Sequence, residues 1–154
     1  MDLGDLVTKE GIVASLNAAT KKQSLQELAR HAAELTGIPQ RDLFDALLQR
    51  ERLGSTGLGR GIAVPHVKFK SLTDIVCIFA RLDTPIDFEA TDNEPVDLIF
   101  LLLAPEHASG DHLKALARIS RLLREPEVSA QLRTSRDSET LLSVLRQPAT
   151  PHAA

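Results

Sequence analysis

Two near-continuous apolar runs lie in the middle of the chain, at residues 74–81 and 95–104. Both are rich in branched and aromatic side chains, as buried β-strands are. A strand that is apolar at successive positions, and not only at alternate ones, belongs to a sheet that is covered on both faces. The chain is therefore predicted to fold as an α/β or α+β sandwich, with helices covering a central sheet.

Helical patterns before these runs can supply one covering layer. Apolar residues recur at helical spacing between residues 25 and 35, with Ser24 as the predicted N-cap, Glu27 at the capping-box position and Gly37 as the stop. A second helix is predicted at residues 40–52. Ahead of both, residues 3–8 are expected to form a helical turn and residues 11–16 a short strand.

Helical patterns after the runs can supply the other layer. A strong helix is predicted at residues 111–124, and Pro126 is expected to open another that reaches about residue 132. Ser135 or Asp137 is expected to cap a last helix that ends at residue 145. The apolar face of the 111–124 helix is predicted to comprise Leu113, Leu116, Ile119 and Leu123.

The remaining segments read as connections and as a tail. Residues 83–88 and 90–95 carry turn residues and are expected to join the two buried strands. Residues 147–154 contain two prolines and little to bury, so they are predicted to be a disordered tail. Residues 1–146 are predicted to form one domain, since the chain has neither an internal repeat nor a linker.

Composition excludes several classes of protein. With 154 residues, 43% hydrophobic and 25% charged, the chain has the composition of an ordinary globular domain. The single cysteine, Cys77, rules out an internal disulfide and fits a reducing, cytoplasmic location. A formal net charge of −3 argues against nucleic-acid binding. No apolar run is long enough for a membrane span, and no signal peptide is evident, so direct membrane insertion is not expected.

The stretch at residues 50–66 carries the most distinctive local sequence. Glycines stand at positions 54, 57, 59 and 61, and the apolar run Ile62-Ala63-Val64 stops at Pro65-His66. Glycines at this density permit close backbone approach or positive φ angles. Proline cannot donate to a sheet ladder, so the strand is expected to end or kink there and to present His66 at its end.

His66 and His112 are the candidate chemical groups among the five histidines. His66 is expected at the end of a strand, and His112 is expected in the first turn of the helix that follows the last buried strand. Such sheet ends commonly hold sites, and a helix N-terminus favours a phosphate. Two imidazoles there would suit phosphoryl transfer or metal binding. The alternative, that each is an isolated hydrogen-bonded histidine, has equal weight on spacing alone.

Arginines near the histidines fit an anionic ligand. An arginine fork can bind two phosphate oxygens and keeps its charge. Arg50 is the best candidate because it closes the second helix where the loop toward His66 begins. Arg52 and Arg60 could equally be solvated. Ser55 and Thr56 could each donate a hydrogen bond to phosphate or merely shape a turn.

Other chemistries have weaker support. A zinc site would need a third ligand at a characteristic spacing, and Cys77 is expected in the core. No G-x-S-x-G elbow occurs, and the glycine pattern precedes a strand where a dinucleotide fold would have it follow one. A Walker lysine is also missing. If phosphate is handled here, it is therefore expected to sit on the protein, without a bound nucleotide.

Residues 50–66 resemble the signature of a known family. The pattern Arg50-Glu-Arg-x-x-Ser-Thr-Gly-Leu-Gly-x-Gly-Ile-Ala-Val-Pro-His66 is similar to that of EIIA domains of the fructose/mannitol type (EIIA type 2), from the phosphoenolpyruvate-dependent sugar phosphotransferase system. The resemblance extends through residues 85–89, 95–105 and 111–123, and so covers roughly residues 3–146. As a chain without a membrane or HPr-like domain, it most resembles the nitrogen-regulatory branch, EIIANtr.

The resemblance implies both a fold and a function. It implies a mixed central β-sheet flanked by helices. It places the phosphorylated residue on His66, the second active-site histidine on His112 and the phosphate-stabilising arginine on Arg50. The phosphoryl group would come from an HPr-like carrier (NPr), with no metal or nucleotide cofactor. Phosphorylation would then regulate partners such as potassium transporters or sensor kinases.

Two positions depart from the family pattern. Val67 follows the histidine where the family usually has glycine, and Arg60 stands where a small polar residue such as asparagine is usual. Either change could alter the partner or the transfer rate.

Two alternative functions remain open. One is a sugar-specific EIIA that passes phosphate to an EIIB domain, and the other is a docking-only regulator without phosphoryl transfer. In either case, Leu58 and Phe69 are candidates for an apolar docking surface, and the sequence leaves the oligomeric state open.

Overall fold

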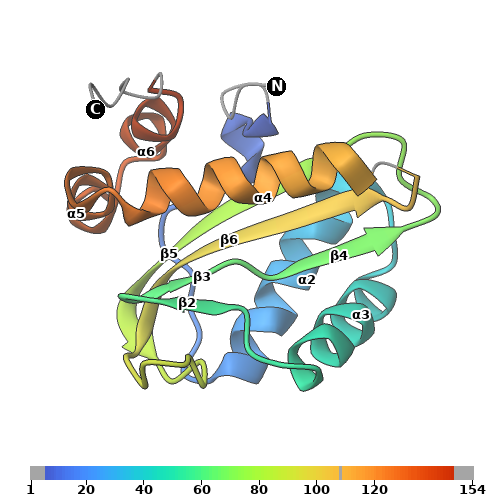
Figure 1. The fold of residues 1–154 in the computed structure, drawn as a ribbon, viewed down its shortest axis with the longest axis horizontal. Coiled ribbons are helices and arrows are strands. Elements are labelled where there is room, and N and C mark those ends of the chain that lie inside the picture. Colours follow the sequence, from blue (N-terminus) through green and yellow to red (C-terminus); the bar gives the residue numbers. More distant parts are fainter. Residues whose placement is uncertain (1–5, 108, 148–154) are drawn as a thin grey trace.

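The computed structural model describes residues 6–107 and 109–147, which form three layers (Figure 1). A mixed sheet lies in the middle, with helices on both of its faces. This architecture confirms the α/β sandwich that the two apolar runs predict. Residues 148–154 of the predicted tail (147–154) and residues 3–5 of the predicted N-terminal turn lie outside the described residues.

The sheet is built around the two apolar runs. They form β5 (Val76–Ile86) and β6 (Val96–Pro105), which pair antiparallel at its centre. β1 (Ile12–Val13) pairs parallel with β5, while β3 (Ile62–Ala63) and β4 (His66–Phe69) both pair parallel with β6. β2 (Gly57–Gly59) extends the sheet antiparallel to β3.

The helices divide between the two faces. One layer consists of α2 (Lys21–Thr36) and α3 (Gln40–Arg52), and the other of α4 (Ser109–Arg124), α5 (Pro126–Thr134) and α6 (Ser138–Leu145). A 3₁₀ turn, η1 (Lys9–Gly11), precedes β1. None of the helices in the described part of the chain has the length and apolar character that a membrane crossing needs.

Alternate residues of the central strands serve two separate cores. Ile78, Leu101 and Leu103 pack toward α2 and α3, whereas Phe79 and Phe100 pack toward the other three helices. Successive side chains of a strand point to opposite faces, so an apolar residue at every position fills both layers. Cys77 lies in the second core, where burial raises the pKa of its thiol to about 12.

Three predictions about helices and turns were wrong. The N-cap of α2 is Thr20, whose hydroxyl oxygen accepts the Gln23 amide, while Ser24 lies inside the helix and donates to the Lys21 carbonyl. Leu113 is 65% exposed, because the buried stripe of α4 runs instead through His112, Ala115, Ile119 and Leu123. The turn expected at 83–88 begins later, since β5 continues to Ile86 past an irregularity in its register.

The other helix predictions are close to the structure. The second helix has its predicted bounds, Gln40–Arg52, and Gly37 ends α2 with a φ of 77°. Of the two candidate caps for α6, Asp137 is the one used, and its carboxylate accepts the Thr140 amide.

The glycine-rich stretch folds into a tight β-hairpin. β2 and β3 are joined by Arg60 and Gly61, which have φ angles of 57° and 80°. Positive φ at both turn positions matches the right-handed twist of the strands. A side chain at position 61 would also collide with Arg133 and Asp97. These glycines therefore shape the hairpin.

Arg60 occupies a left-handed backbone conformation that asparagine tolerates better. The Arg60→Asn variant is expected to raise the free energy of unfolding by about 0.5–1 kcal/mol, since the hairpin turn is kept and its strain is relieved. Urea denaturation measures this change. Arg41→Asn, at an exposed position in α3, is the control and should give no such gain; equal gains in both variants would contradict the account.

Candidate functional site

His66 lies at the first position of β4, so the prediction that it ends a strand was wrong. The segment that pairs with β6 is interrupted at Val64 and Pro65, between β3 and β4. Within this interruption the Pro65 carbonyl accepts a hydrogen bond from the Leu102 amide. β4 then resumes parallel pairing, with His66 opposite Leu102. The proline therefore produces the expected interruption, and the imidazole stands just after it.

One ring nitrogen of His66 is held by the backbone. Its Nδ1 lies 2.9 Å from the Val64 carbonyl oxygen. A carbonyl can only accept, so Nδ1 carries the proton and Nε2 keeps its lone pair. This hydrogen bond fixes the tautomer and makes Nε2 the nucleophilic nitrogen.

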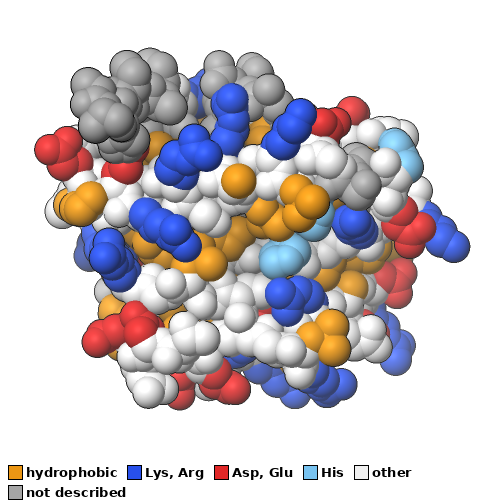
Figure 2. All heavy atoms as spheres, viewed as in Figure 1, with side chains coloured by type: hydrophobic (Ala, Val, Ile, Leu, Met, Phe, Trp, Pro, Cys, Tyr) orange, Lys and Arg blue, Asp and Glu red, His pale blue; other side chains and the backbone are white. Residues whose placement is uncertain are grey.

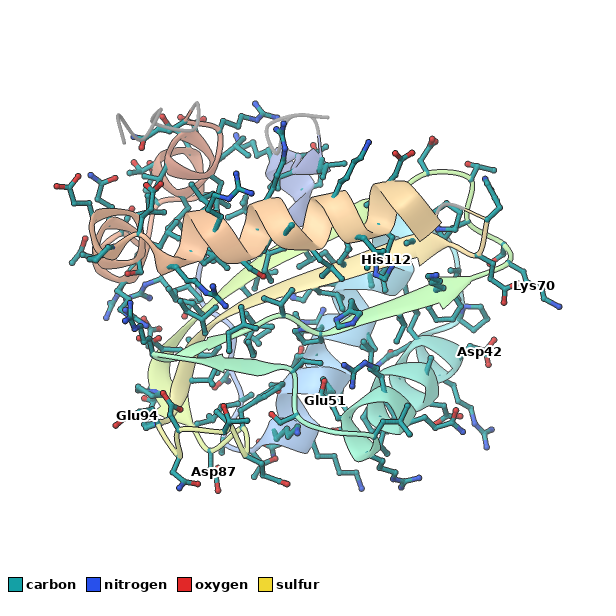
Figure 3. The ribbon with its side chains drawn as sticks, viewed as in Figure 1. Asp42, Glu51, Lys70, Asp87, Glu94 and His112 are labelled. Carbon is teal, nitrogen blue, oxygen red and sulfur yellow. The ribbon has the colours of Figure 1, made fainter. Side chains whose placement is uncertain are left out.

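His112 lies across from His66, in the first turn of α4. The two ring centroids are 5.5 Å apart and the rings are tilted by 47°. Figure 3 labels His112 where it projects from α4 toward β4. Its Nε2 is buried and has no hydrogen-bond partner among the described residues. A buried polar atom of this kind is costly unless a ligand satisfies it.

Burial lowers the pKa of His112, and the nearby His66 and Lys68 lower it further. A lowered folded pKa means that the unfolded chain binds the proton first as the pH falls below about 6.5. Wild-type stability should therefore decrease as the pH falls through that value toward the folded pKa. Urea denaturation between pH 7.5 and 5 should show a steeper loss for wild type than for His112→Gln; parallel losses would contradict this.

A shallow pocket of about 600 Å³ contains both histidines. Its walls come from the end of α3, the start of β4 and the first turn of α4. The lining residues are Ala46, Gln49, Arg50, Arg52, Leu53, His66, Val67, Lys68 and His112. Figure 2 shows pale blue histidine surface near the middle of this face, with Lys or Arg side chains close by.

Arg50 enters the pocket from the C-terminal end of α3. It donates one hydrogen bond, 3.0 Å long, from a guanidinium nitrogen to the Gly54 carbonyl. Arg50 makes no other hydrogen bond or ion pair within the described ranges, so its remaining N–H groups can serve an oxygen ligand. Arg52 also lines the pocket, so both arginines of the Arg-Glu-Arg sequence reach it.

Ser55 and Thr56 lie outside the pocket lining. The Ser55 hydroxyl donates to the Phe88 carbonyl, and the Thr56 hydroxyl donates to the Glu51 carboxylate at 2.6 Å. Both hydroxyl protons are therefore engaged in holding the loop. The structure brings together His66, His112 and Arg50, and it does not bring these two hydroxyls to them.

Arg60 is also remote from the histidines. It borders a different pocket, with Asp92, Asp97 and Arg133, at the turn of the β2–β3 hairpin. Val67, in contrast, lines the histidine pocket. Of the two departures from the family pattern, only Val67 therefore lies where it can affect the acceptor directly.

Four lining residues were not expected from the sequence: Ala46, Gln49, Leu53 and Lys68. Lys68 follows His66 by two positions, and the two-residue period of a strand could have placed it on the same face. Leu53, which is 86% exposed, follows the polar end of α3 and gives no sequence signal of its position. Among the described residues, no group of three or more histidine, cysteine or acidic side chains could hold a metal ion.

The fold and the site define a class of protein: a small α/β/α domain with a tautomer-fixed histidine beside a second histidine and an arginine. Residues 5–147 match the family model described as phosphoenolpyruvate-dependent sugar phosphotransferase system, EIIA 2. The chain therefore belongs to that family.

Relatives point to the nitrogen-regulatory branch. The chain is 57% identical over 148 residues to a nitrogen regulatory protein of Bradyrhizobium diazoefficiens, covering 96% of this chain and 97% of the relative. The structure of nitrogen regulatory protein IIA-Ntr from Neisseria meningitidis superimposes with a TM-score of 0.88 at 32% identity, over 93% of this chain and 98% of that one.

A sugar-branch relative is also similar. The fructose-specific EIIABC component of Bacillus subtilis is 31% identical over 148 residues, which are 96% of this chain but 23% of that protein. The match is therefore confined to one part of a much longer chain.

Proposed function

We propose that this chain is a nitrogen-regulatory EIIA that accepts a phosphoryl group on Nε2 of His66 from an HPr-like carrier (NPr). The observation that carries the proposal is the hydrogen bond from His66 Nδ1 to the Val64 carbonyl, which leaves Nε2 as the nucleophile beside Arg50 and His112. Such a carrier, charged from phosphoenolpyruvate, works in the cytoplasm, and we place the protein there.

Transfer needs positioning and charge stabilisation more than covalent chemistry. The His66 Nε2 lone pair attacks phosphorus as the phosphorus–nitrogen bond to the donor histidine breaks. Positive charge that develops on the His66 ring is stabilised by the Val64 carbonyl, which accepts the Nδ1 proton in a hydrogen bond. Arg50 would neutralise the equatorial oxygens, and a phosphoryl oxygen would satisfy the unpartnered Nε2 of His112.

Regulation would follow from the added charge. Phosphohistidine brings up to two negative charges into a pocket that a partner protein covers when it docks. Three exposed leucines can contact such a partner. Leu53 lines the pocket, Leu113 follows His112 in α4, and Leu58 lies in β2. We therefore propose that phosphorylation changes affinity for targets such as potassium transporters or sensor kinases.

A sugar-specific EIIA is the second candidate, because the alignment with the fructose-specific relative covers 96% of this chain. It would pass the phosphoryl group onward to an EIIB domain. Transfer of the phosphoryl group from the phosphorylated chain to an added fructose-type or mannitol-type EIIB would favour this candidate over the nitrogen-regulatory one. Loss of transfer with retained docking would favour a regulator that acts without phosphate.

Intact-protein mass after incubation with phosphoenolpyruvate, an EI-type enzyme and an HPr-like carrier tests the proposal. Wild type should gain one acid-labile phosphate, and His66→Ala should gain none. His107→Ala is the matched control, because it removes an exposed histidine outside the pocket lining, and it should be phosphorylated normally. Phosphate on His66→Ala would reject His66 as the acceptor.

A further inference from the structure

We propose that the face around His66 docks a protein whose own face is acidic around an apolar centre. This inference rests on the proposed function and adds the chemistry of the partner. Its basis is an uneven distribution of charge: the whole chain has a formal net charge of −3, yet the charged residues that line the histidine pocket are all basic apart from the histidines.

The pocket itself contributes the first group of cations. Arg50, Arg52 and Lys68 line it, and no carboxylate of the described residues does so. Arg52 and Lys68 form no ion pair within the described ranges, so their charges are not cancelled locally. A concave surface with one sign of charge raises the local concentration of an oppositely charged partner.

Helix α4 contributes the second group and extends it away from the pocket. Its exposed side carries four basic side chains and one acidic one, Asp111. The basic residues are Lys114, Arg118, Arg121 and Arg124. Figure 2 shows Lys and Arg side chains along α4, on the same face as the pale blue imidazoles. Lys114 and Arg121 have no ion-pair partner in the described part of the chain.

Exposed apolar side chains on this face favour a protein partner over a nucleic acid. Leu53 is 86% exposed at the pocket wall, and Leu113, 65% exposed, directly follows His112 in α4. Protein interfaces combine apolar and arginine side chains near their centre with a polar rim. A phosphate backbone would use the cations but would leave both leucines without apolar contacts.

Charge reversal on α4 tests the proposal without touching the pocket lining. Lys114→Glu/Arg121→Glu should lower kcat/KM for phosphoryl transfer from the cell's own HPr-like carrier by about tenfold at low salt. The difference from wild type should shrink at about 0.5 M salt, where screening is strong. The matched control is Lys22→Glu/Arg41→Glu, which makes the same charge change in the first turns of α2 and α3, where acidic residues suit the helix dipole.

Phosphoramidate separates docking from chemistry, because this small phosphoryl donor needs no protein interface. It should phosphorylate wild type and both double variants at equal rates. If the α4 variant matches the control with the carrier as donor, the docking proposal is wrong although the proposed function stands. A faster α4 variant would mean a basic partner and would also overturn it.

Two further outcomes would overturn the proposal. If neither the carrier nor phosphoramidate phosphorylates wild type, the proposed function fails and the docking proposal fails with it. If carrier-dependent transfer is unchanged in the α4 variant while wild type alone binds a short DNA duplex, the cations serve a nucleic acid.

Discussion

Glu51→Ala should lower the free energy of unfolding by about 3–5 kcal/mol, the range expected when one partner of a buried ion pair is removed. The Glu51 side chain is 3% exposed and accepts from Lys21 Nζ at 3.0 Å. It also accepts the backbone amide and the hydroxyl of Thr56. Alanine would leave a largely buried ammonium and these Thr56 groups without their partner.

Glu51 also connects the core to the site. Through Lys21 and Thr56, the Glu51 carboxylate links α3 to α2 and to the loop that leads to His66 (Figure 3). The Lys21 ammonium also lies over the Phe88 ring, 4.7 Å from its centroid. Urea denaturation measures the loss. Asp45→Ala, at an exposed position in the same helix, is the control and should change stability by less than about 0.5 kcal/mol. A Glu51→Ala loss as small as that of the control would contradict the account.

Arg50→Ala should slow phosphorylation of His66 by about 100-fold, as expected when a preorganised charge-stabilising donor is lost. Arg50→Lys should recover part of the rate, since it keeps the charge but not the planar fork. Rapid-quench measurement with phosphoramidate as well as the protein carrier shows whether the loss lies in chemistry, because the small donor bypasses docking. The loss should appear with both donors.

Arg52→Ala supplies the comparison for Arg50. Arg52 lies at the same end of α3 and also lines the pocket, but its side chain is exposed. We expect it to slow carrier-dependent transfer a few-fold, as a rim charge does, and to leave the phosphoramidate rate unchanged. Equal effects of the two substitutions with phosphoramidate would remove the special role proposed for Arg50.

The layered fold could be predicted because burial on both sides leaves a plain pattern in sequence. β6 is apolar at nearly every position, β5 is apolar from Val76 to Ala80, and α3 keeps its predicted bounds. The meeting of Arg50, His66 and His112 was implied by the family resemblance, and the structure brings the three into one pocket. Spacing along the chain alone left the two histidines with equal odds of being unrelated.

Other features depend on tertiary contacts that no local pattern reveals. Leu113 is exposed, against the prediction, because α4 turns its small and polar residues, Ala115 and His112, toward the sheet. The Ser24 prediction failed because Thr20, four residues earlier, has the extended backbone that a cap requires.

A buried arginine was equally hidden from sequence analysis. Arg81 lies inside an apolar run, yet it is 8% exposed and donates to the Arg133 carbonyl and to Asp83. Arg133 lies 52 positions further along the chain, so only the folded chain explains how the charge of Arg81 is satisfied in this strand.

The position of phosphate on the His66 ring tests the central claim most directly. Phosphorylated protein labelled with nitrogen-15 can be examined by phosphorus–nitrogen and proton–nitrogen correlation NMR. The account predicts phosphorus coupled to Nε2 of His66, with Nδ1 still protonated and bonded to the Val64 carbonyl. Phosphorus coupled to Nδ1, or attached to any residue other than His66, would contradict it.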